Sequence, residues 1–238
     1  MKDVFVLDDV KKIVIDTGSF DLTIKATDRD DVSVEYSEEI SEDINIGFEN
    51  GELIITATRF MKTFPFFKLN SGMISEVSVD IEVPNHQYQY FTIKSIAGEV
   101  DVEGIAADIF KVNAKAGDYN FKNIRTTEID LQVGAGDLDV EDLTSQVFKL
   151  RCNAGDVDVC DSVLGDSKVS VLAGDIDFKD VELGEVDLSV NAGDISFEQC
   201  KVASCKGSIL AGDVSFDDCA IDKDQVNVKT TAGDIRIN

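Results

Sequence analysis

Apolar and polar residues alternate along the segment from residue 97 to residue 238, and the alternation restarts at a fixed interval. Each restart follows the tripeptide Ala-Gly-Asp or, once, Ala-Gly-Glu. The tripeptides begin at Ala97, Ala116, Ala135, Ala154, Ala173, Ala192, Ala211 and Ala232. Six steps are 19 residues long and the last is 21. Self-similarity at such a period is typical of a repeat architecture.

Each repeat predicts two strands. With the Ala as position 1, positions 4 and 6 are apolar or aromatic, whereas positions 3, 5 and 7 are mostly polar. This period of 2 predicts a strand with one buried face. A second alternating run, for example Phe148, Leu150 and Cys152, precedes the next tripeptide. Turn-forming residues such as Asn123 and Asp142 separate the two runs.

A single 19-residue repeat cannot bury its apolar face, but stacked repeats can, because each strand then pairs with its copy about 4.8 Å away. We therefore predict an all-β fold, a β-solenoid of about seven 19-residue coils. The usual crossover preference predicts a right-handed β-helix. The Gly at position 2 is expected at a tight corner that requires a positive φ.

The first 96 residues also alternate but lack the 19-residue period. Gly18–Leu22 and Gly51–Ile54 resemble degenerate copies of the corner and its strand. We predict that residues 1–96 form an irregular β-rich capping part and that residues 97–238 form the regular solenoid, in one continuous unit. An insertion around residues 222–224 and the basic Arg236 predict an atypical last coil.

Charge narrows the classes of partner. The chain has 22 Lys and Arg against 47 Asp and Glu, a net charge of −25. This balance argues against binding to nucleic-acid phosphates and to anionic membrane surfaces. Asp8 and Asp9 interrupt the N-terminus before any signal-peptide core, and no run approaches the roughly 20 apolar residues of a membrane helix. The visible sequence therefore favours a cytoplasmic protein, and five cysteines, an odd number, favour a reducing compartment.

A family resemblance adds a second expectation about location. The step Val83-Pro84-Asn85, then Thr92-Ile93-Lys94, then the serial Ala-Gly-Asp units resemble a bacterial β-strand repeat family known as "putative adhesin". The resemblance covers most of the chain and is most specific from residue 77 to residue 238. It implies a β-helical fold and a cell-envelope setting, and it supplies no catalytic residue.

Position 3 of the repeats forms what we call the acidic row, and it is the main candidate site. We favour the interpretation that each carboxylate caps its turn by accepting a backbone N–H. The alternative is a calcium-binding surface, since two oxygens sharing one ion would span about the coil spacing. The third hypothesis is a glycan hydrolase, because stacked carboxyls would match the roughly 5–5.5 Å separation of retaining enzymes. The metal candidates are Asp118, Asp137, Asp156, Asp175, Asp194 and Asp213, within a row that also includes Glu99 and Asp234.

The segment from residue 60 to residue 69 contains the candidate partner-binding side chains Phe60, Phe64, Phe66 and Phe67. They could form an exposed anchor for a partner. We favour a capping plug over the open end of the solenoid.

Together these features predict a non-catalytic structural or binding module without a cofactor. We expect an adhesin-like protein with a protein or glycan partner, present as a monomer or weak homo-oligomer. The single histidine, His86, permits no catalytic triad. Cys160 lies at an outward position and is the expected reactive thiol, while Cys200 and Cys219 lie one coil apart, close enough to form a disulfide.

Overall fold

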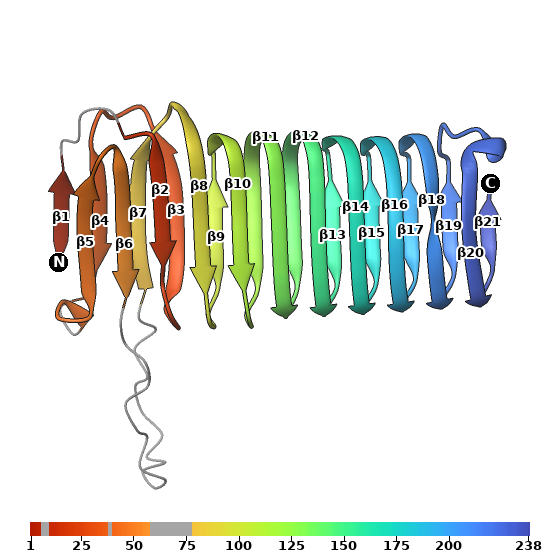
Figure 1. Cartoon of the computed structure of the whole chain (residues 1–238), viewed down its shortest axis with the longest axis horizontal. Helices are drawn as coiled ribbons and strands as arrows, with labels where there is room; N and C mark the ends of the chain where they lie inside the picture. Colours follow the sequence, from red (N-terminus) through yellow and green to blue (C-terminus); the bar gives the residue numbers. More distant parts are fainter. Residues whose placement is uncertain (6–9, 38–39, 58–77) are drawn as a thin grey trace, which may run out of the picture.

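The computed structural model describes residues 1–5, 10–37, 40–57 and 78–238, which form a solenoid of stacked β-strands (Figure 1). Each regular coil has a long strand on the near face of Figure 1 and a short strand on the far face. The long strands run downward and the short strands upward as the coils advance from the N-terminal to the C-terminal end. The solenoid is therefore right-handed, as predicted. Its regular part has eight coils rather than seven, because residues 87–95 supply a long strand before the first tripeptide.

The long face is a run of paired strands that are parallel except at the N-terminal edge. In spatial order its strands are β5 (Ile44–Glu49), β6 (Glu52–Ala57), β2 (Lys12–Asp16), β8 (Gln87–Ser95), β10 (Ala106–Ala114), the second parts of β11 (Tyr119–Ala135) and β12 (Leu138–Ala154), β14 (Val163–Ala173), β16 (Glu182–Ala192), β18 (Lys201–Ala211) and β20 (Val226–Ala232).

The short face is built in the same way. Its strands are β1 (Lys2–Phe5), β4 (Val32–Tyr36), β7 (Ser78–Pro84), β3 (Asp21–Thr27), β9 (Val100–Glu103), the first parts of β11 and β12, β13 (Val157–Cys160), β15 (Ile176–Lys179), β17 (Ile195–Glu198), β19 (Val214–Asp217) and β21 (Ile235–Ile237). A 3₁₀ turn, Lys223–Gln225, fills the predicted insertion before β20.

The N-terminal part is stacked out of sequence order. β2 and β3 form a coil that lies between β6 and β7 on one side and β8 and β9 on the other. β1, β4 and β5 pair antiparallel at the end of the stack, so this region is the irregular end structure that the sequence predicts. The prediction for Gly51 is wrong. Asn50 and Gly51, with φ of 54° and 76°, form the hairpin turn between β5 and β6, because two successive positive φ values suit a type I′ turn rather than a corner.

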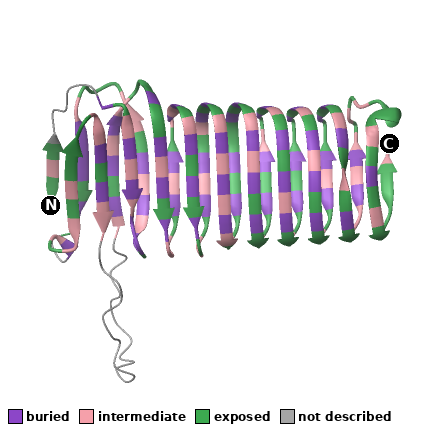
Figure 2. Ribbon diagram, in the orientation of Figure 1, coloured by how far each residue is buried: buried purple, intermediate pink, exposed green. Residues whose placement is uncertain are grey.

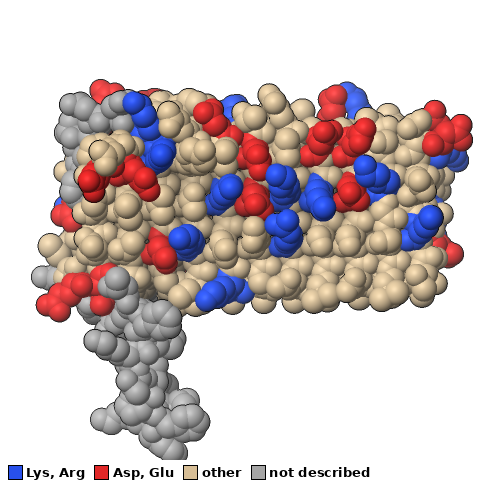
Figure 3. All heavy atoms as spheres, viewed as in Figure 1, with Lys and Arg blue, Asp and Glu red and all other residues tan. Residues whose placement is uncertain are grey.

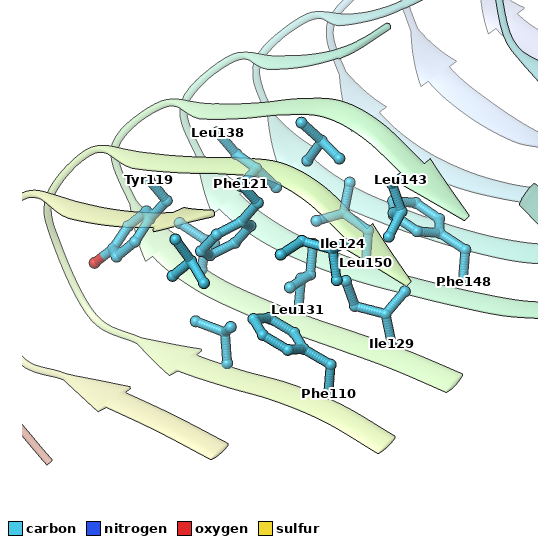
Figure 4. Packing of buried hydrophobic residues seen from close by; sticks show 14 of the residues in the cluster. Phe110, Tyr119, Phe121, Ile124, Ile129, Leu131, Leu138, Leu143, Phe148 and Leu150 are labelled. Carbon is cyan, nitrogen blue, oxygen red and sulfur yellow. The ribbon is translucent and has the colours of Figure 1, made fainter. Parts of the chain in front are cut away.

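The core is a set of columns that run along the solenoid between the two faces (Figure 2). Leu131, Leu150 and Val169 are register partners in successive coils, and all are fully buried. In the last coils the rings of Phe178 and Phe197 stack with centroids 5.0 Å apart, and those of Phe197 and Phe216 with centroids 4.6 Å apart. Figure 4 shows the same filling of the interior near Phe110, Phe121 and Phe148. The 19-residue period thus places aliphatic residues beside aliphatic residues and Phe beside Phe in successive coils of the core.

The corner glycines are required for two reasons. Gly136 has a φ of 114°, which L side chains rarely adopt. A Cβ on this residue would also lie 1.9 Å from the carbonyl oxygen of Gly117 in the preceding coil. Backbones at this corner are stacked too closely for any side chain at position 2.

Candidate functional site

The acidic row forms a continuous series of hydrogen bonds between coils. Each carboxylate Oδ1 accepts the backbone N–H of the residue at the same position in the next coil, at 2.8 to 3.3 Å, over the pairs Asp118–Asp137, Asp137–Asp156, Asp156–Asp175, Asp175–Asp194, Asp194–Asp213 and Asp213–Asp234. The six carboxylates from Asp118 to Asp213 therefore each accept a backbone N–H, as we expected. The donor lies in the following coil, however, and not in the same turn.

The row extends into the irregular N-terminal part. Asp21 Oδ1 accepts the backbone N–H of Glu99 at 2.9 Å, although 78 residues separate them. The prediction that Gly18–Leu22 is a degenerate corner is therefore correct. This corner motif is therefore retained in the β2–β3 coil, which stacks directly against the first coil of the regular solenoid.

These hydrogen bonds explain how like charges can be stacked. Two carboxylates about 4.8 Å apart repel by roughly 0.9 kcal/mol in water. A hydrogen bond to a charged acceptor contributes about 1.5–3 kcal/mol, which is enough to offset that repulsion. The row thus has a structural role that needs no bound ion.

The calcium and hydrolase hypotheses gain no support from this geometry. Calcium needs six to eight oxygen ligands, and one oxygen of each carboxylate from Asp118 to Asp213 already accepts an N–H. Among the described residues, no group of three or more His, Cys, Asp or Glu side chains is arranged to hold a metal ion. The arrangement also repeats from coil to coil, so no single carboxylate pair is set apart as a catalytic site.

Position 5 forms a second carboxylate row on the short face. Desolvation, and then repulsion from Asp158, raise the pKa of both Asp139 and Asp177. Asp158, Asp177 and Ser196, which hold this position in three successive coils, line a groove of about 350 Å³ together with Cys160 and Lys179. Desolvation and the neighbouring Asp161 raise the pKa of the half-buried Cys160 thiol, which opposes the reactivity expected from its outward position.

The other sequence candidates lie elsewhere. Cys200 and Cys219 are stacked as free thiols, with the Cys200 N–H donating to Cys219 Sγ at 3.4 Å. His86 Nε2 lies 2.9 Å from the carbonyl oxygen of Val10. The partner-binding candidates Phe60, Phe64, Phe66 and Phe67 fall outside the described residues.

Acidic and basic side chains are divided unequally between the two faces, and this division was not among the predictions from the sequence. From residue 97 onward, the short strands and the corners before and after them carry twenty acidic and only four basic side chains. The long strands from β8 to β20 carry nine basic and seven acidic ones. Figure 3 shows Lys and Arg gathered along the middle of this long face. Assigning each charge to its predicted strand would have revealed this division.

Cross-coil ion pairs engage several acidic side chains of the long face. Lys149 pairs with Glu128 at 2.7 Å and Lys206 with Glu185 at 3.7 Å. Lys111 and Lys168 form no ion pair with another described residue. The long face therefore presents unpaired positive charge in an otherwise acidic protein.

Comparison with known proteins agrees with this architecture. The family model Toastrack DUF4097 matches residues 10–176 and 161–238. No curated protein matches the chain by sequence. In the described part of the chain, no helix is long and apolar enough to span a bilayer.

Solved structures with the same fold cover nearly the whole chain. A "putative adhesin" from Parabacteroides merdae is 15% identical, with a TM-score of 0.68, and the match covers 100% of this chain and 95% of that one. A "putative adhesin" from Parabacteroides distasonis is 15% identical, with a TM-score of 0.69 and 99% and 96% covered. A "putative lipid binding protein" from the same species is 14% identical, with a TM-score of 0.64 and 100% and 96% covered. At these identities the likeness establishes a shared fold.

Proposed function

The chain belongs to the Toastrack DUF4097 family, and we propose that it is a non-catalytic, adhesin-like binding module that uses its long face. Two structural neighbours carry the name "putative adhesin", which supports a binding role. The proposed partner is a protein or glycan of the cell envelope that presents acidic groups.

The charge division between the faces is the observation that supports this function. Lys111 and Lys168 lie in one register row of the long face, with Asp130 and Lys149 between them. Asp130 pairs with Arg151 and Lys149 pairs with Glu128. Exposed apolar side chains, Leu172 and Leu210, lie on the same face. A flat, rigid sheet with cationic and apolar groups suits an extended acidic surface, whereas the short face would repel it.

Charge reversal on each face tests the proposal. Lys111→Glu with Lys168→Glu changes the long face, and Lys122→Glu with Lys179→Glu changes the short face by the same total charge. Co-sedimentation with the envelope fraction of the cells that make the protein measures binding. We expect the long-face variant to lose at least about tenfold in affinity and the short-face variant to keep it.

Equal loss in both variants, or no binding by the unmodified chain, contradicts the proposal. Protease treatment of the envelope fraction then distinguishes a protein partner from a glycan. Release of reducing sugars by the chain from any bound glycan would contradict a non-catalytic role.

A further inference from the structure

Three lysines of the long face gather around one asparagine. Lys94 of β8 is the register partner of Asn113 in β10, and Lys111 and Lys115 lie two residues before and after Asn113. All four residues are exposed, and the residues that alternate with them along the strands are buried. With strands about 4.8 Å apart and two residues spanning about 6.6 Å, the Cα atoms of Lys94 and Lys111 lie roughly 8 Å apart. We call Lys94, Lys111 and Lys115 the lysine cluster.

The lysine cluster departs from the pairing that other lysines of the repeats follow. Five of these each pair with a Glu of an adjacent coil at 2.7 to 3.7 Å, namely Lys122, Lys149, Lys179, Lys201 and Lys206. None of the three clustered lysines forms an ion pair with another described residue. Because like charges at this spacing repel one another, the cluster favours a negatively charged ligand.

Two acidic residues occupy register positions beside the cluster, and both interact with other groups. Asp130, the register partner of Lys111, pairs with Arg151 at 3.7 Å. Asp16 is the register partner of Lys94, and its Oδ1 accepts the Gly18 N–H at 3.4 Å. The cluster therefore keeps cationic groups that can contact a ligand.

The surface beside the cluster is open and polar. A Cβ on Gly134 of the following coil would lie 2.3 Å from the Lys115 carbonyl oxygen, so this position can carry no side chain. The register row through Asn113, which we call the polar row, carries a hydrogen-bonding side chain in every coil. Its members are Lys94, Asn113, Gln132, Arg151, Ser170, Ser189, Ser208 and Lys229.

The polar row favours a repeating polymer as the ligand. Its side chains recur at steps of about 4.8 Å along the solenoid, so a linear glycan can present hydroxyl groups to successive coils. Tyr90, four residues before Lys94 on β8, is 42% exposed and adds an apolar surface for a sugar ring. An anionic membrane is disfavoured, because the net charge of −25 opposes its approach.

We propose that the lysine cluster binds a negatively charged group, a carboxylate or a phosphate ester, of a linear glycan that lies along the polar row. This inference rests on the proposed function of the long face and narrows its partner to an acidic glycan. Lysine suits either group because its ammonium is a point charge, and the Asn113 amide can donate a hydrogen bond to the same anion. The Debye length is about 8 Å at physiological salt, so the acidic groups of the short face oppose this contact only weakly.

Binding of the full chain to a chemically treated envelope fraction tests the inference. The fraction, from the cells that make the protein, is digested with protease and extracted with organic solvent to remove lipid. We expect the chain to bind this material. Binding should be lost when the carboxylates of the material are amidated or when its phosphate esters are removed with hydrofluoric acid, and the effective treatment identifies the group.

Charge variants locate the contact. Lys94→Glu should weaken binding at least about tenfold, whereas Lys229→Glu, at the other end of the polar row, should keep the affinity within about twofold. Lys115→Gln adds no negative charge beside Asp16 and should weaken binding about threefold. The melting curves of the three variants should match that of the unmodified chain.

Several outcomes overturn the inference. Binding that protease digestion or lipid extraction abolishes does so, as does binding that survives both chemical treatments. Unchanged affinity in Lys94→Glu and Lys115→Gln, or an equal loss in Lys229→Glu, also overturns it. In each of these cases, binding to the untreated envelope still supports the proposed function, whereas a chain that binds no envelope fraction contradicts both.

Discussion

The regular coils from β8 to β21 and the N-terminal strands from β1 to β7 reach the same cross-section by different means. In the regular part, each coil repeats one corner and one set of core columns, and one hydrogen bond of the acidic row joins each pair of successive coils from Asp118 to Asp234. In the N-terminal part, the coil of β2 and β3 is placed between later strands, and antiparallel strands end the stack. A register that repeats every 19 residues is therefore enough to specify the regular solenoid. The end of the stack instead depends on strand pairings that the repeat does not predict.

Corner glycines should show the largest difference between the two regions. Gly136→Ala places a Cβ 1.9 Å from the Gly117 oxygen at a positive φ, so we expect a loss of at least about 4 kcal/mol in unfolding free energy, or failure to fold. The matched change in the N-terminal part is Gly47→Ala, where a Cβ would have no atom within 4 Å. That variant should be neutral or slightly more stable in urea unfolding. Similar losses in both variants would contradict the stacked-corner explanation.

Core aromatic residues should give the next largest difference. Phe197 is stacked between Phe178 and Phe216 and is fully buried, so Phe197→Ala should cost about 3–4 kcal/mol. Phe48, on the N-terminal edge strand β5, is 41% exposed. Phe48→Ala should cost about 1 kcal/mol in the same unfolding experiment. Equal costs would mean that the end of the stack is packed as tightly as its middle.

The change of stability with pH should have opposite signs at Asp177 in the regular part and at Asp31 in the N-terminal part. Both changes should be smaller than those of the corner and core variants. The pKa of Asp177 is raised, so the folded state binds its proton more tightly, and stability rises as pH falls through that raised pKa toward the ordinary value near 3.9. Arg29 lowers the pKa of Asp31 through a hydrogen bond, so that contribution is present at neutral pH and is lost as pH falls through the lowered pKa. Thermal melts at neutral pH should therefore show Asp177→Asn stabilised and Asp31→Asn destabilised. Shifts of the same sign would contradict these assignments.

The regular coils could be predicted from the sequence because each position of the repeat has the same structural environment in every coil. A fixed step of 19 residues places Leu131 beside Leu150 and each Gly of the tripeptide at one corner, so fold and hydrophobic core follow from spacing. The prediction fails at the hairpin of Asn50 and Gly51 because the hairpin glycine, like the corner glycine, has a positive φ and precedes a strand. The asparagine before it was the signal for a type I′ turn.

The candidate site could be predicted only in part. Alternation identified the acidic row, but the donor to each carboxylate lies 19 residues away. A local turn and a neighbouring coil therefore explain the same sequence pattern equally well. The position of the β2–β3 coil within the stack could not be predicted from the sequence either. It depends on contacts between residues far apart in the chain, such as Asp21 and Glu99, which are 78 residues apart.

The central claim is that the acidic row is a structural series of hydrogen bonds between coils. Comparing unfolding free energies of Asp175→Ala and Asp177→Ala, with and without calcium, tests it most directly, since each variant removes one negative charge from the same coil. Asp175 accepts the Asp194 N–H at 2.8 Å, so we predict that Asp175→Ala loses about 1–2 kcal/mol, that Asp177→Ala loses nothing, and that calcium changes neither value. Equal stabilities of the two variants, or calcium-dependent stabilisation of the unmodified chain that Asp175→Ala abolishes, would contradict the claim.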